Sequence, residues 1–168
     1  MQKITVFTIC ALAVAYVCLG NPMQWAACWG APLVTHVVYP FAHANVFHLL
    51  ANILGLYSLY GLNYVRPGLM VASYLVAVAV SFYPQPIVGF SAVLFALMGY
   101  WYARLKQPRR AWVGFFVANG VSLCFSNIAV AAHLSAFFIM FVLVKGKDRL
   151  DRWMLNHWLR KIGAGKRK

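Results

Sequence analysis

The chain has 168 residues, of which 63% are hydrophobic and only 10% are charged. This composition, with a mean hydropathy of +0.72, excludes an ordinary soluble domain and predicts an integral membrane protein. The net charge of +13 does not predict nucleic-acid binding, because the basic residues lie almost entirely outside the apolar stretches.

Six apolar stretches of roughly 16 to 20 residues each approach the length that crosses about 30 Å of hydrocarbon. They lie at 4–20, 44–61, 68–83, 87–103, 111–126 and 128–144. No internal repeat or separate soluble domain interrupts them. The sequence therefore predicts an all-α membrane protein, a bundle of six transmembrane helices over residues 1–144, followed by a basic tail over 145–168.

Basic residues mark every second connection between these stretches. Lys3 precedes the first stretch, Arg66 follows the second, the 104–110 connection is basic, and the remaining basic residues follow the sixth. The connections around 21–43, 84–86 and 126–128 contain no lysine or arginine. Under the positive-inside rule, both termini are expected in the cytoplasm. The small size and the lack of a targeting segment favour the cytoplasmic (inner) membrane of a prokaryote.

The chain contains four cysteines, which are spread along the sequence. Cys10 and Cys18 lie within the first stretch, Cys28 lies in the first outer connection, and Cys124 lies near the outer end of the fifth stretch. This pattern makes no disulfide framework, and free cysteines are the reading we favour. A bridge between Cys28 and Cys124 is the alternative.

The second stretch opens with polar residues at helical spacing. His48 and Asn52 are four residues apart, so on a helix their side chains share one face, one turn apart. His43 suits a position at the helix entrance, facing elsewhere. Asparagine and histidine donors directed into a dry cavity stabilise a developing oxyanion, which is typical of an acyl-transfer site.

The fourth stretch begins with the segment GFSAVLFALMG. Gly89 lies two residues before Ser91, where it lets the backbone turn or approach closely as the chain enters the helix. The Ser91 amide is then a further candidate oxyanion donor. Phe95 lies one turn after Ser91, where its ring is expected to pack against an imidazole.

The fifth and sixth stretches are apolar apart from a few residues, the most informative of which is His133. Small residues recur three or four apart on the fourth helix (Ala92, Ala96, Gly99) and on the sixth (Ala129, Ala132, Ala136), which allows close packing. Close packing is what a hydrogen bond between Ser91 and His133 requires, and such a pair activates a serine nucleophile. Because Asp148 and Asp151 in the tail are the only acidic residues, a triad is excluded and a dyad remains.

The segments HANVFHLLAN, GFSA and AAHLSAFF, in this order on six expected spans, resemble the motifs of the rhomboid family of intramembrane serine proteases. The resemblance spans nearly all of the chain. It implies that Ser91 is the nucleophile and His133 the general base, with His48, Asn52 and the Ser91 amide at the oxyanion. His43 would be a supporting residue. Transmembrane segments of other proteins would be the substrates, and the site would open to the outer face.

Several positions depart from the family pattern. Ala92, Ala136 and Phe95 stand where relatives commonly have glycine, glycine and tyrosine, and residues 21–43 contain no arginine for the family's tryptophan–arginine pair. These departures bear on the structure of the first connection more than on the chemistry. The alternative function is a catalytically inactive relative that binds and routes membrane proteins, and the intact Ser91 and His133 argue against it. His36, His43 and His48 also invite a metal or haem hypothesis, but three histidines at one helix entrance do not suit it. No cofactor and no metal is expected.

The tail alternates basic residues with apolar ones such as Leu150, Trp153 and Trp158. This pattern predicts an interfacial helix on anionic lipid, ending in a basic stub, and a solvated cytoplasmic tail is the alternative. The expected partners are thus the lipid bilayer and transmembrane protein substrates, not nucleic acid.

Overall fold

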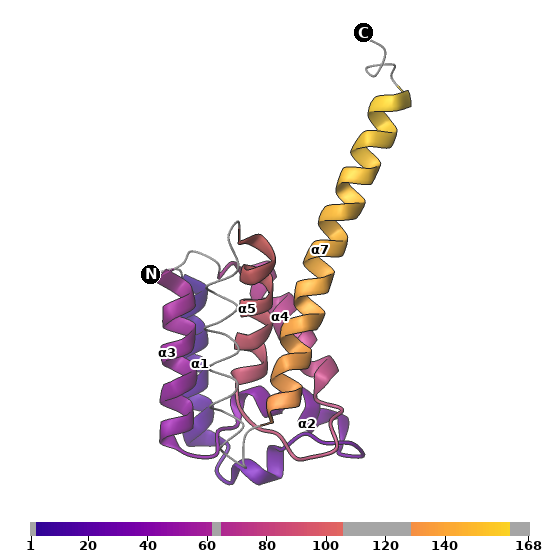
Figure 1. Ribbon diagram of the computed structural model, residues 1–168. Coiled ribbons are helices and arrows are strands. Elements are labelled where there is room, and N and C mark those ends of the chain that lie inside the picture. Colours follow the sequence, from indigo (N-terminus) through magenta and orange to yellow (C-terminus); the bar gives the residue numbers. More distant parts are fainter. Residues whose placement is uncertain (1–2, 62–64, 106–128, 162–168) are drawn as a thin grey trace.

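The computed structural model describes residues 3–61, 65–105 and 129–161, and helices account for most of these residues (Figure 1). The elements are α1 (Lys3–Cys18), the 3-10 turn η1 (Pro22–Trp25), α2 (Leu33–Val38), the 3-10 turn η2 (Tyr39–Phe41), α3 (Val46–Gly61), α4 (Pro67–Val80), α5 (Ser91–Arg104) and α7 (Val130–Lys161). In the described residues, the β-structure consists of one isolated antiparallel bridge between Ala27 and Ile87.

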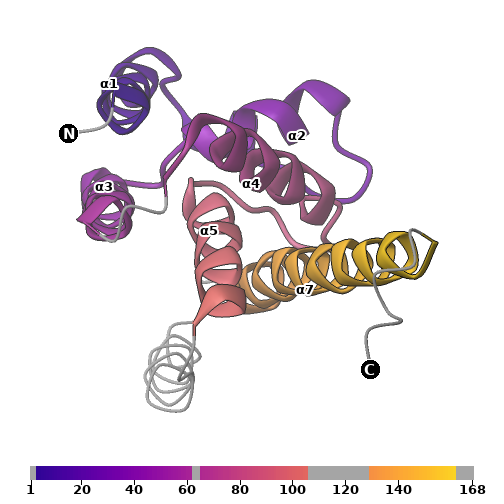
Figure 2. The same ribbon diagram turned by 90° about the horizontal axis from the view of Figure 1, so that it is seen from above.

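The long helices stand side by side, and the short elements between α1 and α3 gather at one end of the bundle (Figure 1). Seen from above, α5 lies between the α1 and α3 pair on one side and α7 on the other (Figure 2). The N-terminal end of α1 and the C-terminal end of α7 lie at the opposite end from the short elements. The two described ends of the chain therefore lie on the same side of the bundle.

The expected spans at 4–20, 44–61, 68–83, 87–103 and 128–144 each overlap one described helix. The fifth, 111–126, lies outside the described residues. By length and hydropathy, α7 is the described helix that is able to cross a membrane alone. Leu33–Phe41 and Val46–Leu59, bent by 77°, pass the same test as a pair, whereas Lys3–Cys18 and Pro67–Val80 are apolar but shorter.

Two helix boundaries differ from the expected ones. The fourth apolar stretch begins at residue 87, but its helix begins at Ser91, because Ile87 pairs with Ala27 in an extended segment and Gly89, the expected turn residue, has a φ of +105°. The last helix does not end near residue 144. It runs without a break through the expected tail to Lys161, so that the tail continues along the axis of α7 instead of starting a separate helix.

The core is densest where α5 packs against α7, the most extensive contact between two described helices. The small residues of both helices, Ala92, Ala96, Ala132 and Ala136, are buried as expected. Gly99 is buried against the backbone carbonyl of Phe137, and an added Cβ there would overlap its oxygen. The close approach of the two helices therefore depends on small residues at the crossing.

The connection between α1 and α3 is held onto α4 by polar side chains. His36 Nδ1 lies 2.7 Å from Ser81 Oγ, the Tyr39 hydroxyl donates to the Ala77 carbonyl at 2.8 Å, and Tyr74 donates to the Val37 carbonyl at 2.6 Å. The same connection reaches the start of α5, since the Gly89 amide donates to the Tyr39 carbonyl at 2.9 Å. These bonds fix the backbone next to Ser91.

Candidate active site

Ser91 is the first residue of α5, and it is half-buried. The first amides of a helix have no partner within the helix, so the Ser91 and Ala92 amides point beyond the helix end. The positive end of the helix dipole lies at the same place. The local backbone thus offers N–H donors and a favourable potential for a developing negative charge next to the Ser91 hydroxyl.

His133 meets Ser91 from the first turns of α7. Its Nε2 lies 2.6 Å from Ser91 Oγ, across 42 residues of sequence. The Phe95 ring stacks on the imidazole, with centroids 4.6 Å apart and planes 10° apart. The expected Ser91 and His133 contact and the expected packing of Phe95 are both confirmed by this geometry. The stacked ring fixes the plane of the imidazole, which directs Nε2 at the hydroxyl.

His48 and Asn52 lie on α3, beside the turn that precedes Ser91. A Cβ added to Gly89 would lie 2.5 Å from His48 Cε1, 2.6 Å from His48 Nε2 and 3.5 Å from Asn52 Nδ2. Both side chains therefore lie beside the Gly89 backbone, and a Cβ at this position would overlap the His48 ring. The shared face that the four-residue spacing predicts is directed toward the Ser91 turn.

Asn52 is 3% exposed, and its Nδ2 donates to the His48 carbonyl at 3.0 Å. A side-chain amide carries two N–H donors, so this bond orients the group and leaves one donor over. The start of α3 is fixed as well, since Asn45 Oδ1 accepts from the His48 amide at 2.9 Å. The two α3 donors are thus held by their own helix before any ligand arrives.

His43 lies in the connection just before α3, where it is buried. Its Nδ1 lies 3.1 Å from the Phe41 carbonyl, and its ring meets the His48 ring edge-on at 5.2 Å. Burial lowers the pKa of His43 to about 4, so the ring is neutral at neutral pH. Within the described part of the chain, His43 Nε2 has no hydrogen-bond partner.

His36 does not join the other two histidines. Its ring pairs with Ser81 Oγ and stacks on Phe82, with centroids 4.1 Å apart. Over residues 3–61, 65–105 and 129–161, no three His, Cys, Asp or Glu side chains form a group suited to a metal ion. His36 thus lies apart from His43 and His48, and the three histidines do not form one group.

Three of the four cysteines lie in the described residues. Cys10, Cys18 and Cys28 are free cysteines, and Cys124 lies outside the described residues.

Sequence reasoning missed the hydrogen bonds of His36 and Tyr39 that hold the first connection in place. The sequence signal for them was a histidine and a tyrosine in an uncharged connection, and neither residue type indicates a partner that lies 45 or 38 residues further along the chain.

A cavity of about 220 Å³ lies between α1 and α4, lined by apolar side chains from both helices and by Phe41 and Phe90. It contains neither member of the Ser91 and His133 pair. Its lining is almost entirely apolar and offers no pair of groups for hydrolysis, so we do not assign the active site to this cavity. The polar groups converge instead at the start of α5.

Comparison with protein-family models matches residues 28–146 to the family described as Rhomboid domain. The matched region is more than half of the chain and contains every residue of the Ser91 site described above. A comparison with curated protein sequences finds no match.

Proposed function

Since this chain belongs to the rhomboid family, we propose that it is an intramembrane serine endopeptidase that cleaves transmembrane segments of other membrane proteins. One observation carries the proposal. Ser91 Oγ lies 2.6 Å from His133 Nε2, within hydrogen-bond distance, on two different helices of an apolar bundle. A nucleophile and a base at that distance are the minimum for covalent acyl transfer.

The reaction begins when His133 Nε2 accepts the proton of the Ser91 hydroxyl. Ser91 Oγ then bonds to the carbonyl carbon of the substrate, whose oxygen becomes negatively charged. The Ser91 amide, the remaining Asn52 N–H and His48 stabilise this oxyanion. His43 supports His48 from the side.

The acyl-enzyme forms when the carbon–nitrogen bond breaks and the imidazolium of His133 gives its proton to the leaving amine. A water molecule then loses a proton to His133 and attacks the ester, which frees Ser91 and the new carboxyl end. No acidic residue orients the imidazole, since the two carboxylate side chains lie at 148 and 151. The Phe95 ring takes the orienting role instead.

The proposed site opens to the outer, periplasmic side of the cytoplasmic membrane. Ser91 lies at the end of the bundle that carries the uncharged connections, whereas Lys3, Arg66 and Arg104 lie at helix ends on the other side. The positive-inside rule then places both termini in the cytoplasm. Water reaches the dyad from the near aqueous face without crossing the bilayer.

The test is covalent labelling of the purified protein with a fluorophosphonate, which requires no substrate. Wild type is expected to label, and Ser91→Ala and His133→Ala are expected to lose labelling. Ser58→Ala is the matched control, because Ser58 sits in a helix with its hydroxyl bonded to the Leu54 carbonyl, away from the site. Thermal unfolding of each variant separates loss of chemistry from loss of fold.

Absence of labelling in folded wild type would overturn the proposal and favour the inactive relative that binds and routes membrane proteins. Equal labelling of Ser91→Ala would overturn the assignment of the nucleophile. Cleavage of a reconstituted single-span protein by wild type but not by Ser91→Ala then tests the substrate class.

A further inference from the structure

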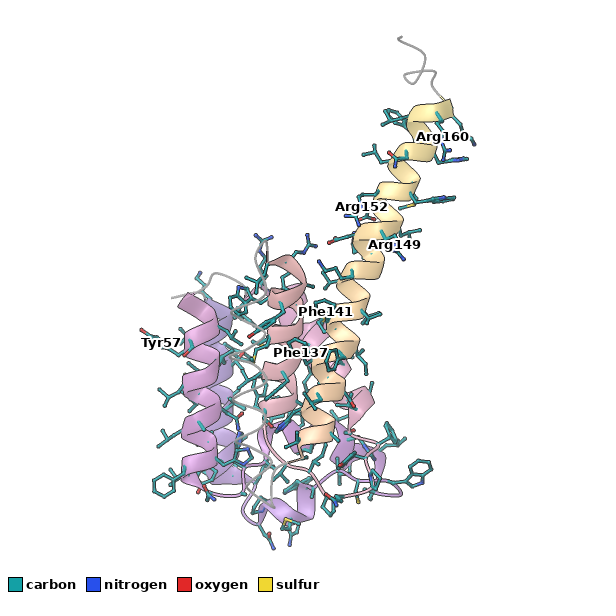
Figure 3. The ribbon with its side chains drawn as sticks, viewed as in Figure 1. Tyr57, Phe137, Phe141, Arg149, Arg152 and Arg160 are labelled. Atoms are coloured by element: carbon teal, nitrogen blue, oxygen red, sulfur yellow. The ribbon has the colours of Figure 1, made fainter. Side chains whose placement is uncertain are left out.

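The C-terminal half of α7 extends beyond the rest of the bundle. Every buried residue of α7 lies between Val130 and Val144. Beyond Val144 the helix continues to Lys161, and its first turn there meets the end of α5 through the ion pair between Asp148 and Arg104. Figure 3 shows Arg149, Arg152 and Arg160 on this part. We call residues 147–161 the α7 extension. The family match ends at residue 146, immediately before it.

Four large apolar side chains of the α7 extension form an apolar face and are each about half exposed: Leu150 at 54%, Trp153 at 58%, Met154 at 47% and Trp158 at 56%. Their spacing of three, one and four residues puts them on one side of a helix. Leu155, at 55%, lies outside this face. If the helix stayed straight in water, this apolar face would be exposed to solvent. Exposed apolar faces of this size mark interaction sites.

A basic face lies next to the apolar one. It consists of Arg149, Arg152 and Arg160, whose spacing of three and eight residues also keeps them on one side. The two carboxylate side chains of the chain pair with other cations, Asp148 with Arg104 at 3.2 Å and Asp151 with Lys147 at 2.5 Å. The basic face is thus left for a negatively charged partner.

Gly146 lies where the apolar part of α7 ends, between Lys145 and Lys147. It is the only glycine of α7, and an added Cβ would meet no atom within 4 Å. Packing therefore does not require a glycine here. Glycine makes an exposed helix less stable than alanine does. Gly146 therefore makes the helix backbone easier to bend at this position.

We propose that α7 bends at Gly146 and that the α7 extension lies on the anionic phospholipid surface of the leaflet from which it emerges. The apolar face enters the boundary between headgroups and acyl chains, with the tryptophans at the depth they prefer. The arginines of the basic face bind lipid phosphates. The positive charge of the basic face favours an anionic lipid as the partner. The extension lies next to the end of a membrane span, which favours the membrane surface over a soluble protein.

The bend competes with the ion pair between Arg104 and Asp148, which holds the first turn beyond Gly146 against the end of α5. The Arg104 side chain is 43% exposed, and an ion pair that is open to water contributes little. Contacts of three arginines with an anionic surface outweigh it. On a bilayer without anionic lipid no such contacts compete with the ion pair, and the helix stays straight.

The experiment places an environment-sensitive fluorophore on Met154→Cys, in full-length protein whose four native cysteines are replaced by alanine. The protein is reconstituted in nanodiscs of phosphatidylcholine alone or mixed with phosphatidylglycerol. We expect quenching by lipids brominated in the acyl chain only when phosphatidylglycerol is present. Arg149→Gln, Arg152→Gln and Arg160→Gln together are expected to lower the ratio of bound to free extension by roughly a hundredfold.

The matched control replaces the same three arginines by lysine, which keeps the charge and is expected to keep the quenching. Gly146→Ala is expected to weaken the quenching without altering fluorophosphonate labelling of Ser91, because it stiffens the helix far from the dyad. Labelling thus reports on the proposed function and quenching reports on the extension, so that either can fail alone.

Three outcomes would overturn the proposal. A fluorophore that stays in water on anionic nanodiscs excludes lipid binding. Equal quenching on both lipid compositions excludes a requirement for anionic lipid. The fluorophore could also become protected from water in detergent, to an extent that increases with protein concentration. That result would identify a second copy of the chain as the partner of the apolar face.

Discussion

Single residues decide the geometry of the site, and Gly89 is the clearest case. Its φ of +105° is a backbone conformation that side chains with a Cβ rarely adopt. Its missing Cβ leaves the space that the His48 ring occupies. One glycine therefore serves two needs, the turn into α5 and the approach of α3 to Ser91.

Gly89→Ala is expected to slow fluorophosphonate labelling of Ser91 by about 100-fold, since a shift of about 1 Å at a reacting group costs that much. The added methyl group has to push His48 away or change the turn. The measurement is the labelling rate of the folded variant.

Gly68→Ala is the control, because Gly68 has an ordinary backbone conformation and an added Cβ meets nothing within 4 Å. It should label at the wild-type rate. A Gly89→Ala protein that also labels at that rate would show that the His48 position does not affect the nucleophile.

Helices bring the two candidate catalytic residues together, and the α5 and α7 contact sets their distance. Ser91 begins α5 and His133 lies near the start of α7, so the hydrogen bond between them exists only while the helices stay close. Figure 3 shows Phe137 on the part of α7 that runs beside α5. Gly99 contacts the Phe137 backbone about two turns beyond Ser91, and this contact keeps the two axes near one another.

Gly99→Ala is expected to lower the free energy of unfolding by about 1–3 kcal/mol, because the added methyl group overlaps the Phe137 carbonyl oxygen and backbone atoms do not move aside. Gly55→Ala is the graded comparison. Its Cβ would meet the end of the Leu94 side chain at 2.9 Å, which is able to rotate. Thermal unfolding in detergent measures both, and a larger effect at Gly55 than at Gly99 would contradict this account of the packing.

At the scale of the whole molecule, the first connection links distant helices to the site. His36 bonds to Ser81 across 45 residues, Tyr39 bonds to the Ala77 carbonyl, and the Tyr39 carbonyl accepts from the Gly89 amide. The chain contains no arginine between residues 21 and 43 to stabilise this connection by charge. Hydrogen bonds to α4 hold it instead.

His36→Ala is expected to lower the free energy of unfolding by about 2 kcal/mol or more, because a buried ring and its hydrogen bond are both lost. His36→Phe keeps a ring to stack on Phe82 and should lose only part of this. Chemical denaturation in detergent micelles gives the two values. Equal loss in both variants would mean that the hydrogen bond to Ser81, and not the stacking, accounts for the effect.

Local pattern alone predicts several features of this protein. The apolar stretches predict the helices, because length and hydropathy are properties of contiguous residues. The small residues on α5 and α7 predict close packing, and Phe95 predicts its contact with the imidazole of His133. The four-residue spacing of His48 and Asn52 predicts a shared face, because helix geometry is fixed by the backbone.

Only the tertiary structure decided the remaining features. The apolar stretch begins at residue 87, but residue 87 is not helical, because Ile87 pairs with Ala27. This contact spans 60 residues, and no local pattern encodes it. The bonds of His36 and Tyr39 likewise depend on which helix the connection meets. The last helix continues through Gly146 to Lys161, although a glycine that follows the last apolar residue of a span is a common signal for a helix end. Partners distant in sequence are chosen by packing of the whole chain, and that choice exists only in three dimensions.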